Sequence, residues 1–310
     1  AHSLTWKLTF GGPIAGLRSI DFSRSGTATG CTIGTPVGSG ASWSVTLTGC
    51  SAGTVVLGLK PETVVDAVRN WGPRSQVNAS SLLIDRTAPH AATPQVSLRS
   101  GVTLPSTSTS AGLMATLDLA ATDPGGAGVR DYDVRRSTDG GAWSTVGVDL
   151  TAATLNLTLS PGHAYRFSVR ARDRAGNVGD WVTGPVIRAY LSQQTNTAIN
   201  WKGSWTRVID PRFSGGSVRY ATAAGASATY AFTGRAVAWV TTVAPNRGAA
   251  RVYLDGVLVA TVNTYAATTT FGRVAFAKAW ASSGFHTIRI VSAGTVGHGR
   301  IDIDALEVVR

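Results

Sequence analysis

The sequence is poor in several features that mark common protein classes. Its 310 residues include only four lysines, two glutamates, two cysteines and one methionine. No apolar run approaches the roughly 18 residues that cross a bilayer, so no transmembrane helix is predicted. The chain begins at Ala1 and shows no basic start followed by an apolar stretch, which indicates either a signal peptide already removed or a piece of a longer chain.

Motifs for catalysis are also missing. The chain has no G-x-S-x-G, H-E-x-x-H, P-loop or G-x-G-x-x-G pattern. Glycosidases need two carboxylates across the scissile bond, and Asp302 and Asp304 share one face of a predicted strand because side chains alternate with period two. The commoner interpretation of this pair is a polar, solvated strand face, and neither His286 nor His298 has a nucleophile-and-carboxylate pattern beside it. We therefore predict that this chain is not an enzyme.

The two cysteines, Cys31 and Cys50, flank one hairpin-like stretch. This arrangement indicates a single disulfide, and a disulfide indicates an oxidising, extracytoplasmic location. Two buried free thiols are the alternative. Two cysteines do not make a zinc site without further ligands, and none of the five histidines is close to them in the sequence.

Positive charge is abundant but dispersed. The formal net charge is +11, and 24 of the 28 basic residues are arginines scattered without a long run. One explanation of this positive charge is a genome that favours arginine, alanine and glycine codons. The more specific explanation is an anionic partner. Proteins that bind nucleic acid usually combine a basic stripe with a recognisable module. The sequence has neither, so we predict no nucleic-acid partner.

What the chain does contain is typical of β-structure. Hydrophobic residues make up 43%, charged residues make up 15%, and 36 residues are glycine, a mixture that suits short strands joined by tight turns. The clearest element is 251–262, RVYLDGVLVATV, in which apolar residues alternate on both sides of Asp255-Gly256. Asp-Gly is the preferred centre of a type I′ turn, so this stretch predicts a β-hairpin. The length allows two or three domains.

Residues 1–86 form the first predicted module. Its segments DFSRSGTATGCTIGTP, TGCSAGTVVLGL, VVDAVRNWGP and IDRTAP resemble a bacterial Ig-like domain. The resemblance implies a β-sandwich with a Cys31–Cys50 disulfide, and such modules mostly act as spacers.

Residues 87–190 form the second predicted module. Seven short predicted strands separated by turn residues are typical of a sandwich. The segments VRDYDVRRSTDGGAWSTV and YRFSVRARDRAGNVGDW resemble a fibronectin type III domain of the bacterial kind. We expect Tyr132 and Tyr165 to be core or corner aromatics.

One turn of the second module repeats a pattern of the first. Asp173 and Asn177 have the same spacing as Asp66 and Asn70. Spaced Asp and Asn oxygens in a loop bind calcium; the interpretation we favour is a hairpin turn in which Asp and Asn cap the backbone. We predict no cofactor and leave a structural calcium ion open.

Residues 191–310 form the third predicted module. About eight predicted strands indicate a jelly roll, and GRAVAWVTTVAPNRGAARVYLDGVLVATV, GFHTIRIV and GRIDIDALEVV resemble a galactose-binding-like β-sandwich. That superfamily includes many carbohydrate-binding modules of secreted bacterial enzymes, and the resemblance implies a fold more strongly than a sugar. The predicted fold class is therefore all-β, with three tandem β-sandwich domains.

The third module is also the best candidate for a binding surface. It holds twelve basic and five acidic residues and four of the nine tryptophans. Sugar rings stack on Trp or Tyr, and Arg donates paired hydrogen bonds to carboxylates. Trp239 alternates with Val237 and is expected in the core. The candidate ligand-binding residues are Trp201, Trp205, Asn246, Arg247, Tyr265 and Arg300. Among them the three beside glycines, at positions 246, 247 and 300, are expected to be exposed.

Two functions follow from these observations. The first is a secreted or cell-surface, non-catalytic region whose third module binds carbohydrate, acidic glycans included, while the other modules act as spacers. The second is a structural surface, adhesion or filament protein that acts through contacts between modules or copies. A ligand site predicts an exposed cluster of aromatic and arginine side chains in the third module, and a structural role predicts apolar contacts instead.

Overall fold

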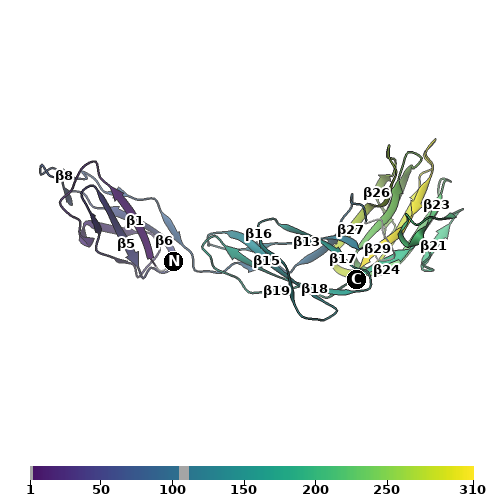
Figure 1. Ribbon diagram of the computed structural model, residues 1–310, viewed down its shortest axis with the longest axis horizontal. Helices are drawn as coiled ribbons and strands as arrows, with labels where there is room; N and C mark the ends of the chain where they lie inside the picture. Colours follow the sequence, from purple (N-terminus) through teal and green to yellow (C-terminus); the bar gives the residue numbers. More distant parts are fainter. Residues whose placement is uncertain (1–2, 105–111) are drawn as a thin grey trace. The chain divides into compact units, whose positions relative to one another are not determined.

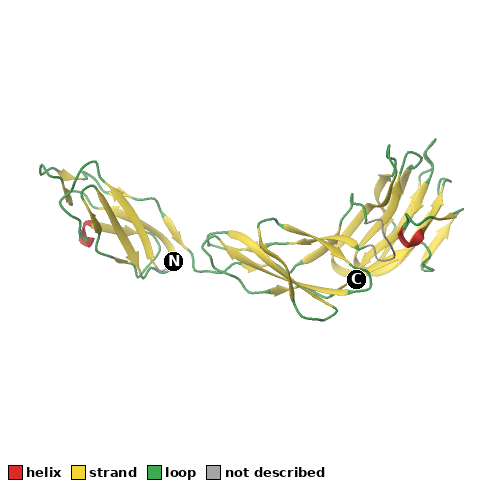
Figure 2. Cartoon of the chain, viewed as in Figure 1, coloured by secondary structure: helices red, strands yellow, loops and turns green. Residues whose placement is uncertain are grey.

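The computed structural model describes residues 3–104 and 112–310, and its regular secondary structure is almost entirely β-strand (Figure 1, Figure 2). The helical segments in this part of the chain are two single 3-10 turns, η1 (Ser19–Asp21) and η2 (Ser214–Gly216). No helix among the described residues is long and apolar enough to cross a membrane. The predicted all-β class is confirmed.

The strands belong to two compact units, which we describe separately. The first unit comprises residues 1–90, 121–130 and 171–179. The second unit comprises residues 91–120, 131–170 and 180–310. The first unit therefore contains the whole first module and three short segments of the second module, 87–90, 121–130 and 171–179.

Two small antiparallel sheets and a hairpin make up the first unit. Its strands are β1 (Ser3–Thr9), β2 (Phe22–Ser25), β3 (Thr32–Ile33), β4 (Val37–Ser39), β5 (Ser42–Thr48), β6 (Gly53–Leu59), β7 (Val64–Val65), β8 (Trp71–Gly72), β9 (Val77–Asn78) and β10 (Leu82–Ile84). One sheet has the order β1-β5-β3, with β4 also on β5. The other has the order β10-β6-β2, with β9 also on β6, and β7 pairs with β8 alone.

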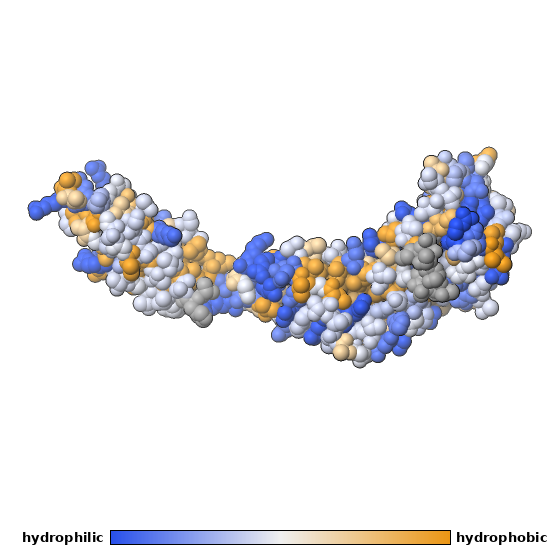
Figure 3. All heavy atoms as spheres, viewed as in Figure 1, coloured by the Kyte–Doolittle hydropathy of each residue, from blue (hydrophilic) through white to orange (hydrophobic). Residues whose placement is uncertain are grey.

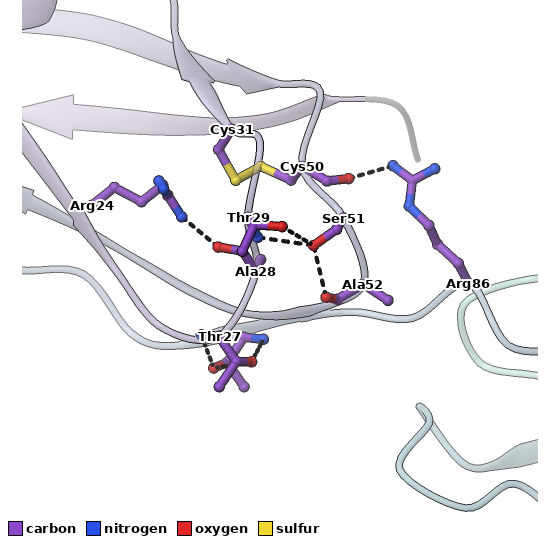
Figure 4. Close-up of a disulfide and its surroundings, with 10 residues drawn as sticks. Arg24, Thr27, Ala28, Thr29, Cys31, Cys50, Ser51, Ala52 and Arg86 are labelled. Carbon is purple, nitrogen blue, oxygen red and sulfur yellow. Dashed lines mark hydrogen bonds between the residues drawn. A yellow bond between two sulfur atoms is a disulfide. The ribbon is translucent and has the colours of Figure 1, made fainter.

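The core of the first unit lies between these two sheets. Val45 and Leu47 of β5 and Val55 of β6 are fully buried there, because their side chains alternate inward along each strand. Cys31 and Cys50 form the predicted disulfide at the edge of this core, with an S–S distance of 2.01 Å (Figure 4). The disulfide prediction is confirmed.

The disulfide closes a loop between residues 19 positions apart in the sequence. A crosslink of this loop length restricts the unfolded chain and stabilises the folded state by about 3 kcal/mol. We therefore expect the double variant Cys31→Ser, Cys50→Ser to lower the unfolding free energy of the first unit by about that amount. Urea denaturation followed by tryptophan fluorescence measures this change. An unchanged midpoint for the first unit would contradict the prediction.

The strands of the second module lie mostly in the second unit, except β14 and the ends of β15 and β18 that fall within 121–130 and 171–179. They are β12 (Gln95–Leu98), β13 (Leu113–Asp118), β15 (Val129–Thr138), β16 (Ser144–Leu150), β17 (Thr154–Leu159), β18 (Ala164–Asp173), β19 (Val182–Thr183) and β20 (Ile187–Gln193), with the short strands β11 (His90–Ala91) and β14 (Ala121–Thr122) nearby in the chain. One sheet has the order β12-β13-β17, and the other begins β16-β15-β18-β20. Tyr165 is buried, and its hydroxyl accepts a hydrogen bond from Ser160 N (2.8 Å), so the expected corner aromatic is confirmed.

The third module supplies the remaining strands of the second unit. They are β21 (Ile199–Lys202), β22 (Thr206–Ile209), β23 (Ser217–Ala221), β24 (Ser227–Val243), β25 (Ala249–Leu254), β26 (Val257–Asn263), β27 (Thr270–Ser292), β28 (Ile301–Ile303) and β29 (Ala305–Val309). The large sheet continues in the order β20-β29-β24-β27-β25-β26, and β22-β23-β28 form a smaller sheet. Trp239 lies fully buried in the core of this module, as predicted.

The predicted hairpin is confirmed by β25 and β26. They pair antiparallel, with Leu254 opposite Val257. Asp255 and Gly256 occupy the turn with φ values of 51° and 84°, which are the positive values that a type I′ turn requires at both central residues. The Asp-Gly pair therefore gave the turn its position and its type.

One strand belongs to both modules of the second unit. β20 pairs with β18 through Tyr165 and Ile187, and with β29 from Ala189 opposite Val309 onward. The segment after β12 also bonds to β27, where Val274 N donates to Val102 O (2.9 Å). Because a hydrogen-bonded sheet runs from one module into the other, experiments on the third module need the full chain.

Candidate functional site

Three loops of the third module meet at one end of its strands. They are the loop between β24 and β25, the segment after β26, and the loop between β27 and β28. Gly248 N donates to Arg300 O (2.9 Å), and Thr264 N donates to Gly248 O (3.0 Å), so the backbone ties all three together. Four of the six predicted ligand-binding residues lie on these loops: Asn246, Arg247, Tyr265 and Arg300. We call Asn246, Tyr265, His298 and Arg300 the loop-end cluster.

The loop-end cluster contains an exposed aromatic side chain. Tyr265 is 50% exposed, and its ring packs edge-on against His298 with 5.2 Å between ring centroids. His298 Nδ1 lies 2.6 Å from Pro245 O, which fixes the position of the imidazole. Asn246 is exposed beside them. Tyr265 is one of the predicted binding residues, whereas His298, 33 positions later in the chain, is not.

Arg247 differs from its prediction. We expected it to be exposed, but it is only 6% exposed, since its guanidinium binds Asp302. Arg247 Nε and Nη2 donate to Asp302 Oδ2 at 2.8 and 2.6 Å, and Arg300 Nε donates to Oδ1 at 2.7 Å. Burial lowers the pKa of the Arg247 guanidinium, and the Asp302 charge opposes that shift. Arg247 is therefore a positioning residue that fixes the loop rather than a surface cation.

Arg300 is held from two sides. Besides its bond to Asp302, its guanidinium lies 3.9 Å from the centre of the Tyr220 ring. Tyr220 is the cross-strand partner of Asp302, so both side chains project from the same face of the smaller sheet. The Arg300 side chain is 21% exposed. Its orientation is thus fixed before any ligand binds.

The aspartates of the last strands are not a solvated strand face, as we had interpreted them. Asp302 and Asp304 are both fully buried. Burial raises the pKa of Asp304 to about 8, although a hydrogen bond from Ser214 N (3.2 Å) opposes the shift. The solvated interpretation failed because it considered only strand periodicity, whereas loops from distant parts of the chain cover this face.

A cavity of about 310 Å³ lies next to Tyr265. It is lined by Gly101, Val243, Val262, Asn263, Tyr265, Ala266, Thr270, Arg273, Val274 and Ala275. Its walls combine aliphatic side chains with a phenol, a guanidinium, an amide and a hydroxyl. Pockets for small molecules have this size and this mixture of apolar walls with a few polar groups. Arg273 was not among the predicted residues, because nothing in its local sequence distinguishes it from the other arginines.

The two predicted tryptophans lie elsewhere in the module. Trp201 and Trp205 pack against the module core and against each other, with ring centroids 4.8 Å apart. Trp205 Nε1 donates to Lys202 O (3.1 Å), and Arg219 lies over the Trp201 ring at 5.0 Å. These contacts give both rings a packing role, and the structure does not bring them together with the loop-end cluster.

Trp280 has a similar role on β27. Its ring stacks on His286 at 3.9 Å between centroids, and both contact the core ring of Phe232. His286 Nδ1 in turn lies 2.8 Å from Asp255 Oδ2 at the hairpin turn. The hydrogen bond with His286 is the main cause that lowers the pKa of the Asp255 carboxyl. Most aromatic residues of the third module are therefore packed. Tyr265 and Phe285 are exposed, and Tyr265 lines the cavity described above.

The Asp–Asn turns of the first unit have the predicted capped geometry. Asn177 N and Nδ2 donate to Asp173 at 2.8 Å each, and Asn70 makes the same two bonds to Asp66. Gly176 takes a φ of 94° between them.

Asp173 also has carboxylate neighbours. It lies within 4.8 Å of carboxylate oxygens of Asp85 and Asp123, the one group of three potential metal ligands among the described residues. Backbone N–H groups of Thr87 (2.9 Å) and Ala127 (2.7 Å) already donate to Asp85. This group is the candidate place for the calcium ion that the sequence leaves open.

Comparison with known proteins shows relatives that act on carbohydrates. Over 169 residues, 52% of this chain, it is 30% identical to an A type blood N-acetyl-alpha-D-galactosamine deacetylase of Flavonifractor plautii. Over 106 residues, 34% of the chain, it is 39% identical to an A type blood alpha-D-galactosamine galactosaminidase of the same organism. Over 90 residues, 28% of the chain, it is 39% identical to Endoglucanase B of Cellulomonas fimi. The matches cover 21%, 9% and 8% of the lengths of these relatives.

No protein-family profile matches the chain. Among solved structures, an exo-beta-1,3-galactanase of Phanerochaete chrysosporium is 10% identical, with 83% of this chain and 78% of that one covered and a TM-score of 0.29. The catalytic domain of a GH87 alpha-1,3-glucanase is 18% identical, with 39% and 28% covered and a TM-score of 0.29. Likenesses this weak carry no argument about the present chain. The sequence relatives do show that its homologues are carbohydrate-active proteins.

Proposed function

We propose that this chain is a non-catalytic part of an extracellular carbohydrate-active protein and that its third module binds a glycan in the cavity beside Tyr265. The observation that carries the proposal is an exposed aromatic ring at the rim of a cavity whose walls hold Arg273, Asn263 and Thr270. The carbohydrate-active relatives support the same ligand class. The disulfide supports an extracellular location, because disulfides persist in oxidising compartments.

The chemistry of the cavity suits a sugar. The C–H face of a pyranose packs on an aromatic ring such as that of Tyr265. Hydroxyl groups of the sugar pair with the amide of Asn263 and the hydroxyl of Thr270, and a uronate carboxylate pairs with a guanidinium in a bidentate manner. The formal charge of +7 on residues 191–310 also favours an anionic glycan. The buried Arg247–Asp302 pair holds the loop between β24 and β25, and Ala244 of that loop is hydrogen-bonded to the segment that carries Tyr265.

Calorimetric titration of the full chain tests the proposal. The ligands are glycans ending in N-acetylgalactosamine or galactosamine, cello-oligosaccharides, and oligosaccharides that contain uronate, each at low and high salt. We expect at least one class to bind and Tyr265→Ala to raise its Kd about tenfold, the effect of losing about 1.4 kcal/mol of contact. If the bound class is the uronate one, Arg273→Gln is expected to weaken it and remove its salt dependence.

A matched control removes an arginine charge away from the cavity. Arg289 is exposed on the second half of β27 and lies over the Tyr253 ring at 4.2 Å. Arg289→Gln makes the same change of net charge as Arg273→Gln, so it is expected to leave glycan affinity unchanged. Absence of binding to every glycan, or equal affinities for the wild type and Tyr265→Ala, would refute the proposed site.

A specific feature also favours the second candidate function, contacts between copies of the chain. In the described part of the chain β26 pairs with β25 only and so forms an edge of the large sheet. Val257, Leu258 and Val259 on it are all exposed. Exposed apolar edge strands are templates for pairing with another chain. In this case sedimentation analysis would show concentration-dependent association that Val259→Lys abolishes. A monomer at all concentrations would rule this function out.

A further inference from the structure

The first module contains a second large cavity, which the proposed glycan site does not involve. It has a volume of about 740 Å³ and lies entirely within the first unit. Its walls come from β1, from the inner face of β6, from the β7–β8 hairpin and from β9. Hydrophobic residues of the first module also reach the surface on the face drawn in Figure 3. Trp71 and Val77 in its lining are 64% and 56% exposed, so the cavity is an open groove between the two sheets.

The core is incomplete along β1. Leu4, Trp6 and Leu8 point inward on this strand and pack against the core, but each is only partly buried. Val45 and Leu47, which point inward on the neighbouring strand β5, are 1% and 0% exposed. The sandwich is thus filled behind β5 and left open beside β1.

The backbone of β1 is also unpaired on the side of the groove. β1 pairs with β5 and with no other strand in the described part of the chain. Phe10 N donates to Ala41 O (2.9 Å) at the end of this ladder. Because hydrogen-bonded positions alternate in antiparallel strands, the N–H and C=O groups of Thr5, Lys7 and Thr9 point away from β5. Lys7 and Thr9 line the groove.

Three of the five Lys, Thr, Asp and Asn side chains that line the groove, those of Asp66, Asn70 and Asn78, already have hydrogen-bond partners among their neighbours. Asp66 accepts hydrogen bonds from Val68 N, Asn70 N and Asn70 Nδ2 at 2.8 to 2.9 Å. Asn78 Oδ1 accepts one from Gln76 Nε2 (2.7 Å). A glycan needs several free polar partners, whereas an extended peptide needs a free strand edge and apolar pockets at alternate positions. The groove offers the second combination.

We propose that the first module binds an extended polypeptide segment as an additional strand along β1, with apolar side chains at alternate positions filling the groove. Trp71, which is 64% exposed on the β7–β8 hairpin, covers one end of the bound strand. The free edge from Thr5 to Thr9 spans about 15 Å, enough for a segment of five residues or slightly more. This site acts independently of the glycan site in the third module.

Amide hydrogen exchange of the full chain, followed by NMR, tests the proposal. The probes are nine-residue peptides with valine or isoleucine at alternate positions, threonine between them and lysine at both ends. In the free chain we expect fast exchange at Thr5, Lys7 and Thr9, and at least tenfold slower exchange with saturating peptide. A peptide with a central proline serves as the control, since it lacks an N–H for the ladder.

Variants of one position separate backbone pairing from side-chain contact. Lys7→Pro removes an N–H that does not bond to β5 and is expected to raise the peptide Kd at least tenfold, while Lys7→Ala keeps the N–H and the affinity. Three results would overturn the proposal: slow exchange at these amides in the free chain, no slowing with any peptide, or slowing that cello-oligosaccharides produce instead. Slowing that rises only with protein concentration would identify a second copy as the occupant and would also overturn it.

Discussion

Replacing Asp302 by alanine is expected to lower the unfolding free energy of the second unit by about 3 to 5 kcal/mol. Asp302 is fully buried and receives three hydrogen bonds from two arginines. Its loss leaves the Arg247 guanidinium buried without a counter-charge, and Arg300 loses its anchor. Removing one partner of a buried ion pair costs more than the pair itself contributes, because the remaining charge stays desolvated.

Chemical denaturation of the full chain measures this loss of unfolding free energy. A double variant and a control variant show whether the stranded charge of Arg247 causes it. Adding Arg247→Met to Asp302→Ala removes the stranded charge, so the double variant is expected to recover at least 2 kcal/mol of the loss. Asp210→Ala breaks an exposed pair with Arg212 (2.6 Å) and is expected to change stability little. A double variant as unstable as the sum of its two single variants would contradict the coupling of Arg247 and Asp302.

Replacing Glu307 by glutamine is expected to raise the unfolding free energy of the second unit at pH 8 by about 3 to 5 kcal/mol. Glu307 is fully buried on β29, between Leu191 of β20 and Ala238 of β24. Neither carboxyl oxygen has a hydrogen-bond partner among the described residues. Burial therefore raises the pKa of Glu307 to about 8.

The direction of the pH dependence follows from proton binding. Between the ordinary glutamate pKa of 4.5 and the folded pKa of about 8, the unfolded chain has lost the Glu307 proton and the folded chain has kept it. Stability therefore falls as pH rises through this window and is highest below it. Asp304, with a pKa of about 8 for the same reason, acts in the same direction. The Glu307→Gln variant lacks the Glu307 contribution, so its stability falls less steeply with pH.

Unfolding free energies measured from pH 4 to pH 9 test this prediction. Glu62 is the other glutamate of the chain and is exposed. Glu62→Gln is therefore the matched control and is expected to follow the wild-type profile. Equal slopes for the wild type and Glu307→Gln would show that Glu307 ionises normally in the folded chain.

Much of the fold was predictable because its signals are local. Asp255-Gly256 specified a turn with positive φ at both positions, and alternating apolar residues specified the strands on either side. The single pair of cysteines left one disulfide to form. These features depend on neighbouring residues or on a unique partner, so no knowledge of the tertiary arrangement is needed.

The candidate site was predictable only in part. Asn246, Tyr265 and Arg300 were proposed separately, and the structure brings them to one loop end. Trp201 and Trp205 were chosen for their chemistry, yet they pack on the core and on each other. Residue type alone identified the aromatic candidates, but it did not distinguish a ring at a cavity rim from a ring that fills a gap in the packing.

The sequence by itself determined the all-β class, the hairpin and the disulfide of this protein, because periodicity, turn chemistry and cysteine count act over short distances. Only the tertiary structure decided which polar residues are buried and which surfaces are open. An arginine beside a glycine is predicted to be exposed. Arg247 is buried instead, because it donates hydrogen bonds to Asp302, 55 positions later in the chain. The cavity beside Tyr265 and the groove beside β1 likewise form between distant segments, so no local pattern records them.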